Sequence, residues 1–210
     1  TTMVDPQVFE AMKPYFCDLY GNPSSMHEFG GQVMHAVDKA REQVKDFLGA
    51  RDAKEIIFTA SGSEGDNMAI RGVLEANKNK KHIITTKIEH PAVLNVYKYL
   101  EKQGYDVTYL DVDSKGNLDL NQLAESITDE TALVSIMYAN NETGVILPVE
   151  KAAKIVKAKT PKIKFHSDAV QAAGKIPLDV KNTDIDLLTI AGHKIHAPKG
   201  IGALYIKTGT

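Results

Sequence analysis

Two periods of apolar residues alternate along the chain from residue 55 onward. Short apolar runs bounded by polar or turn-forming residues are typical of buried strands, whereas amphipathic helices place apolar residues every three or four positions. The runs predict strands at 55–59, 82–86, 106–112, 133–139, 162–168, 187–190 and 202–206. The intervening segments predict helices at 66–77, 91–103, 119–127 and 149–158.

This alternation indicates the fold class. Consecutive strand–helix–strand units form parallel sheets with right-handed crossovers, and their helices cover both faces of the sheet. We therefore expect an α/β protein with a mainly parallel seven-stranded sheet sandwiched by helices. Residues 51–210 should form this sheet domain.

The first 50 residues show helical periodicity only. A helix is predicted over Pro6–Tyr20, with Asp5 as its N-cap and a proline at its first position. A second helix is predicted over Val33–Leu48, and Gly49 would end it. Residues 1–50 should thus form an N-terminal helical arm.

Composition and charge narrow the function classes. The net charge of -2 gives no electrostatic case for direct binding to nucleic acid or to an anionic membrane. The sequence has no run of eighteen apolar residues and no signal-peptide pattern. Its single cysteine, Cys17, excludes an internal disulfide and fits a reducing compartment, so we expect a cytoplasmic protein. We expect Cys17 to be a semi-buried structural thiol on the first helix.

Candidate chemistry gathers at the ends of the predicted strands. The loop Ser61–Asn67 follows one strand and opens a helix, and its small residues would let backbone N–H groups approach an anion. The alternative is a plain turn capped by a serine. His90 and the turn Asn140–Gly144 follow two other strands. His90 could stack on a planar ligand or could merely cap the next helix, and Asn residues commonly serve turns.

Two further strand ends carry charged residues. Asp168 ends an apolar strand, and a carboxylate there needs a cation or good donors. A protonated pyridine nitrogen would be such a cation, and Gln171 lies near enough in sequence to reach the same ring. Lys194 comes after His193 just past another strand, and its amine is a candidate for forming an imine if burial disfavours the ammonium form. A solvated loop lysine is the alternative.

Together these strand ends describe one ligand. A phosphate cradle, a stacking imidazole, a carboxylate for a ring nitrogen and a lysine for an aldehyde all fit pyridoxal 5'-phosphate (PLP). A nucleotide-binding α/β domain that uses only the Ser61 loop is an alternative. It leaves Asp168 and the His193–Lys194 pair unexplained.

The motifs also resemble those of the cysteine desulfurases of the NifS/IscS class, which are fold-type I PLP enzymes of the class V aminotransferase family. The matching stretches are Gly21–Ser25 with His27, Ser61–Asn67, Glu89–His90, Asn140–Gly144, Asp168–Gln171 with Gly174–Lys175, Gly192–Lys194, and Pro198–Ala203. The resemblance implies conversion of L-cysteine to L-alanine, with the sulfur passed on as a persulfide. It also implies a homodimer, and an iron–sulfur scaffold or another sulfur acceptor, such as a tRNA-thiolation partner.

The resemblance assigns the catalytic roles by position. Lys194 would form the imine with PLP and move the substrate Cα proton. His90 would stack on the ring and shuttle a proton. Asp168 would pair with the ring nitrogen, Gln171 would bind the ring's phenolic oxygen, and Asn141 would contact the substrate or that oxygen.

The phosphate would be bound by Gly62 and Ser63, with His193 as a further donor. Ala191 departs from the pattern, because many members have a phosphate-binding serine there. In the family, the persulfide-forming cysteine and the arginine that holds the substrate carboxylate would lie beyond residue 210. The sequence would then be truncated at both ends and lack a small C-terminal domain.

Three further functions remain open on the same residues. Selenocysteine lyase and other PLP-dependent lyases or aminotransferases share this cofactor site. A protein of the same fold could also act without catalysis, as a binding partner in a sulfur-transfer complex. The absence of Lys194 or Asp168 would indicate such a non-catalytic protein, and both residues are present.

Overall fold

The computed structural model describes all residues from Thr1 to Thr210. The α-helices are α1 (Pro6–Met12), α2 (Pro14–Cys17), α3 (Glu28–Leu48), α4 (Gly62–Ala76), α5 (Pro91–Lys102), α6 (Leu120–Ser126) and α7 (Val149–Lys159). The strands are β1 (Ile56–Thr59), β2 (His82–Thr86), β3 (Asp106–Leu110), β4 (Thr131–Ser135), β5 (Lys164–Asp168), β6 (Leu187–Ala191) and β7 (Gly202–Ile206). Short 3-10 helices are η1 (Ala53–Glu55), η2 (Val180–Asn182) and η3 (Gly192–Lys194).

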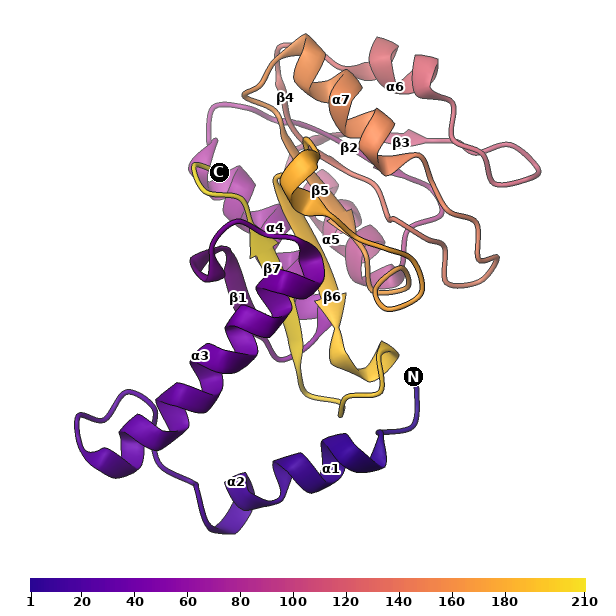
Figure 1. The fold of residues 1–210 in the computed structure, drawn as a ribbon. Helices are drawn as coiled ribbons and strands as arrows, with labels where there is room; N and C mark the ends of the chain where they lie inside the picture. Colours follow the sequence, from indigo (N-terminus) through magenta and orange to yellow (C-terminus); the bar gives the residue numbers. More distant parts are fainter.

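All seven strands form one sheet in the order β1-β7-β6-β5-β4-β2-β3 (Figure 1). The five strands from β6 to β3 are parallel to their neighbours, whereas β7 pairs antiparallel with both β6 and β1. The structure therefore confirms the expected α/β class with a mainly parallel seven-stranded sheet.

Helices cover both faces of the sheet because successive strand residues point to opposite sides. Ile83 on β2 and Leu133 on β4 pack with α4 and α5, in a core of 13 buried residues. Their neighbours Ile84 and Val134 belong to the other core, of 28 buried residues, which includes residues of α3, α6 and α7. Burial of consecutive residues explains why these strands read as continuous apolar runs rather than alternating ones.

The chain changes direction between β2 and β4. After β2 it moves to β3 at one edge, and then returns past β2 to β4, β5 and β6. Such a reversal places the connecting helices on opposite faces and leaves a crevice at the carboxyl ends of the strands, where α/β proteins bind ligands. The segments that follow β2 and β4 contain His90 and Asn141.

Helices α1 and α2 lie apart from the layers of the sheet, whereas the end of α3 packs against the core through Leu48 (Figure 1). The single helix expected over Pro6–Tyr20 is wrong: α1 ends at Met12, and α2 begins at Pro14 and ends at Cys17. Lys13 keeps helical backbone angles, but Pro14 lacks the N–H group that would continue the hydrogen-bond pattern of α1, so the helix is interrupted there. Cys17 is exposed, because no other layer covers α2, so the expectation of a semi-buried thiol is also wrong.

Other helix and strand limits differ by at most five residues from those expected. Helix α3 begins at Glu28, earlier than Val33, because the His27 side chain caps it by accepting from Gly30 N. Strand β4 ends at Ser135, although Ile136 N and Tyr138 N still donate to carbonyls of β5. None of the helices combines the length and apolar character needed to cross a membrane.

Candidate active site

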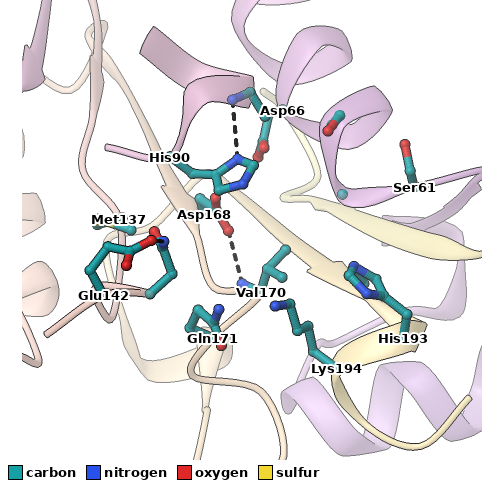
Figure 2. A pocket seen from close by; sticks show the side chains of 15 residues that line it. Ser61, Asp66, His90, Met137, Glu142, Asp168, Val170, Gln171, His193 and Lys194 are labelled. Carbon is teal, nitrogen blue, oxygen red and sulfur yellow. Dashed lines mark hydrogen bonds between the residues drawn. The ribbon is translucent and has the colours of Figure 1, made fainter. Parts of the chain in front are cut away.

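A pocket of about 390 Å³ opens at the carboxyl edge of the sheet (Figure 2). Strand ends and helix starts surround it, as expected for the reversal point of a parallel sheet. All eight residues expected to bind a cofactor line it. The lining is Ser61, Gly62, Ser63, Asp66, His90, Ala92, Met137, Asn141, Glu142, Asp168, Val170, Gln171, Ala191, His193 and Lys194.

The first turn of α4 forms one wall of the pocket. This helix begins at Gly62 rather than at Asp66, because the Ser61 side chain accepts from Glu64 N at 3.1 Å and caps it. The N–H groups of Gly62 and Ser63 belong to the first turn, so they have no acceptor within the helix. These groups and the positive end of a 15-residue helix make the wall suited to an anion. The serine cap, posed as the alternative to an anion cradle, is thus present, and it leaves free the N–H groups that such a cradle would use.

Asp168 ends β5 at the floor of the pocket. Its side chain is only 6% exposed, and its Oδ1 accepts from Val170 N at 2.9 Å. Burial raises the pKa of Asp168, while the Val170 bond and the nearby His90 and Lys194 side chains oppose that rise. A buried carboxylate with so few donors is stabilised by a cationic or N–H partner.

Lys194 projects into the pocket from η3, the single turn that follows β6 (Figure 2). Its side chain is half-buried, so its amine is less desolvated than that of a fully buried lysine. His193 precedes it, and burial together with the Lys194 charge lowers the pKa of His193. Ala191 also lines the pocket but brings no hydroxyl group, so the departure noted in the sequence leaves one donor fewer.

His90 is both a helix cap and a lining residue. Its Nδ1 accepts from Ala92 N at 3.1 Å, at the start of α5. An amide always donates, so Nδ1 carries no proton while this bond exists, and the proton of the neutral ring lies on Nε2. Protonation of Nδ1 would remove the cap. The two interpretations of His90 as cap or as ligand therefore do not exclude each other.

The two neighbouring asparagines have different tasks. Asn140 is buried, donates to Ile88 O at 2.9 Å and accepts from Thr143 N at 2.9 Å, so it fixes the turn. Asn141 reaches the pocket and donates to Glu142 Oε1 at 2.6 Å. The two amides are equivalent as residue types, and only their positions in the turn separate them.

Two buried carboxyl groups were not among the expected site residues. Asp66 lines the pocket with its Oδ1 buried and unpartnered. Burial and the nearby Asp168 raise its pKa well above the ordinary value. A prediction that the helix begins at Gly62 would have pointed to Asp66, because residues four apart lie on the same helix face and Gly62 was already expected in the site. Glu89 precedes His90 in sequence and is 4% exposed, with its Oε2 unpartnered.

The fold and pocket define a class of α/β protein. Its pocket at the carboxyl edge of the sheet combines the N-terminus of a helix, a buried carboxyl group and a lysine amine. The sequence profile of the Aminotransferase class-V family matches residues 1–210, and the chain belongs to that family. A cysteine desulfurase from Nostoc sp. strain PCC 7120 is 63% identical over 209 residues, covering 100% of this chain and 52% of that protein. The chain thus spans about half the length of the curated relatives it matches.

Solved structures agree with this assignment. A NifS-like protein superposes with a TM-score of 0.97 and 44% identity, covering 100% of this chain and 57% of that one. SspA, solved in complex with cysteine, superposes with a TM-score of 0.93 and 40% identity, covering 98% of this chain and 59% of that one. The resemblance to cysteine desulfurases found in the sequence is therefore confirmed, and so is the fold-type I assignment.

Proposed function

We propose that residues 1–210 form the cofactor-holding part of a PLP-dependent cysteine desulfurase. The observation that carries the proposal is that Lys194, Asp168 and the start of α4 line one pocket. Their chemistry matches the aldehyde, the ring nitrogen and the phosphate of PLP. The 63% identity to a cysteine desulfurase favours the desulfurase reaction over the other reactions that PLP supports.

The polar groups of the pocket fit PLP. The Gly62 and Ser63 N–H groups are free to bind phosphate oxygens. Asp168 is buried with a raised pKa, which an N–H donor from a ring would relieve. The hydroxyl of Ser61 already receives the Glu64 N–H bond, so backbone groups, Ser63 and His193 would hold the phosphate in place of the hydroxyl that Ala191 lacks.

The proposal assigns tasks to Asp168, Lys194 and His90. PLP supplies an aldehyde that combines with amines and a ring that withdraws electrons from the substrate Cα. Asp168 would keep the ring nitrogen protonated. Lys194 would anchor the cofactor and then remove the Cα proton of the substrate. His90 would lie against the ring, with the proton on its Nε2 free to be shared.

Gln171 and Asn141 would orient the ring and substrate from the opposite wall. Both line the pocket and are half-buried. Gln171 would donate to the ring oxygen. Asn141 would donate to the same oxygen or to the substrate, after exchanging its present bond to Glu142.

The overall reaction would transfer sulfur from L-cysteine to an enzyme thiolate. The C–S bond of the substrate breaks, an S–S bond forms on the enzyme, and the substrate Cβ takes up a proton to give L-alanine. Cys17 is not the accepting thiol in this proposal, because it lies on α2 and outside the pocket. The persulfide would then pass to an iron–sulfur scaffold or another acceptor.

The surroundings of the site complete the proposal. Residues 51–210 would be the PLP-binding domain and residues 1–50 an arm at the edge of the active site. We infer a homodimer in the cytoplasm, on the basis of the family resemblance and the single cysteine. SspA was solved with cysteine, which supports cysteine as the substrate class.

The decisive experiment is to trap the cofactor on its lysine. PLP is added to the protein, the visible absorbance is recorded, and borohydride reduction is followed by peptide mass mapping. We expect the adduct on Lys194, its loss in Lys194→Ala, and its retention in Lys199→Ala, an exposed lysine of the same loop. An adduct on another lysine, or none, would overturn the proposal.

Selenocysteine lyase or another PLP-dependent lyase or aminotransferase is the second candidate, because the same pocket would serve it. Product analysis separates these activities. Alanine release that depends on cysteine, with one sulfur transferred per alanine, supports the desulfurase. Release only from selenocysteine, or formation of a keto acid, would support the other activities.

A further inference from the structure

The first five residues lie against the turn that carries Lys194, although nearly the whole chain separates them in sequence. Figure 1 shows the N-terminus beside the end of β6. Thr2 N donates to His193 O at 2.7 Å, and Asp5 N donates to His196 O at 2.9 Å. Residues 2–5 therefore form a strap along the residues on both sides of Lys194.

The Thr2 hydroxyl joins the two ends of this turn. It donates to His193 O at 3.1 Å and accepts from His196 N at 2.8 Å. One oxygen atom thus bridges the residue before Lys194 and the residue two positions after it. The bridge closes a ring of bonds around the Lys194 backbone.

The turn needs such support because His196 has an unfavourable backbone. Its φ of 63° is the only positive value among the non-glycine residues of the chain. A left-handed conformation is unfavourable for an L-residue, so it persists only where neighbouring contacts hold it. Besides its two backbone bonds to the strap, the His196 Nδ1 atom lies 3.2 Å from Met3 O.

We propose that Thr2 is a positioning residue for Lys194: its hydroxyl fixes the turn and so sets where the lysine amine enters the pocket. This inference rests on the proposed function. Thr2 does not line the pocket itself, so it would act only through the backbone of residues 193–196. The strap would also connect the helical arm to the lysine, because Asp5 caps α1 through Gln7 N.

The test compares Thr2→Val, which has the same shape without the hydroxyl, with Thr2→Ser, which retains it. Thr160→Val is the matched control. It removes a hydroxyl that accepts from Lys162 N. Thr160 precedes β5, so it lies at the amino ends of the strands, away from the pocket. Thermal unfolding of all three variants verifies that each is folded.

The first measurement is amide hydrogen exchange of the protein without PLP. We expect exchange at residues 195–197 to become about tenfold faster in Thr2→Val, as for the loss of one or two neutral hydrogen bonds. Thr2→Ser and Thr160→Val should exchange like the wild type. Unchanged exchange in Thr2→Val would overturn the bridge, whatever the cofactor proves to be.

The second measurement is the rate at which PLP forms the borohydride-trapped adduct on Lys194. We expect a severalfold slower rate in Thr2→Val and recovery in Thr2→Ser. Faster exchange with an unchanged trapping rate would show that the strap is structural only, and so would overturn the positioning role. An absence of adduct in the wild type would instead overturn the proposed function, and the positioning role with it.

Discussion

Asp66 Oδ1 lies 3.6 Å from His166 Nε2, and the two side chains are 1% and 0% exposed. The spacing is that of an ion pair, but the surroundings favour neutral groups. Burial lowers the pKa of His166 to about 3, and burial together with Asp168 raises the pKa of Asp66 well above its ordinary value. Ser135 Oγ and Thr189 Oγ1 already lie within hydrogen-bond distance of the two ring nitrogens, at 2.8 and 3.0 Å.

A neutral pair predicts that Asp66→Asn does not destabilise the fold. At pH 7 the free energy of unfolding, measured by urea denaturation, should rise, because a neutral Asp66 must take up a proton on folding and asparagine need not. Breaking a buried ion pair would instead cost roughly 3–5 kcal/mol. A loss of that size would show that Asp66 and His166 are charged.

Glu89 should make the protein less stable as the pH rises. Burial raises the pKa of Glu89 to about 8 from 4.5, although Thr86 Oγ1 and Met137 N both donate to its Oε1 at 2.8 Å. Between these values the folded state keeps the proton that the unfolded state has lost. The stabilising proton is therefore present at low pH and is lost as the pH rises through the folded pKa.

The corresponding experiment is Glu89→Gln, which keeps the acceptor and cannot ionise. Its free energy of unfolding should rise relative to wild type by up to about 1.4 kcal/mol for each pH unit between 5 and 8. Urea denaturation at several pH values measures the slope. Glu101→Gln, at an exposed position of α5, is the control for the effect of a Glu-to-Gln substitution by itself. A flat difference for Glu89→Gln would mean that Glu89 is ionised in the fold.

Two glycines of α4 should respond in opposite directions to alanine. A Cβ at Gly62 would lie 2.8 Å from Val170 Cγ2, whereas a Cβ at Gly72 would meet nothing within 4 Å. Gly62→Ala should therefore destabilise the fold by about 1–3 kcal/mol, and Gly72→Ala should stabilise it by about 0.5–1 kcal/mol. Thermal and urea unfolding measure both. Combination with Val170→Ala should relieve the Gly62→Ala defect, and a defect that remains would contradict the contact.

Asp168→Asn should weaken PLP binding without unfolding the protein. Asparagine can still accept from Val170 N, but it offers a ring N–H only a neutral oxygen. Loss of a charge-assisted bond predicts a roughly 10- to 100-fold weaker affinity, measured by absorbance titration. Asp129→Asn, at an exposed turn, should bind PLP like the wild type. If Asp168→Asn bound PLP as tightly as the wild type, Asp168 would not be the partner of the ring nitrogen.

The sequence predicted the sheet and the strand-end residues because both depend on local periodicity. Buried strands read as apolar runs, and parallel strands present their carboxyl ends at one edge, so the sequence pattern alone places Asp168 and Lys194 together. Predicted helix boundaries that depend on a capping side chain were less accurate. Helix α4 begins at Gly62 because Ser61 caps it, and the later start expected at Asp66 hid the fact that Asp66 faces the pocket.

The sequence by itself determined the α/β class, the helical character of the first 50 residues, and which polar residues lie close after each strand, since these follow from nearest-neighbour patterns along the chain. Tertiary structure alone decided how deeply each group is buried and what it contacts. The Asp66–His166 contact, the Thr2 bridge across the Lys194 turn and the position of His90 as both helix cap and pocket-lining residue are all of this kind. The first two depend on segments distant in sequence, and all depend on atomic distances that no local pattern encodes.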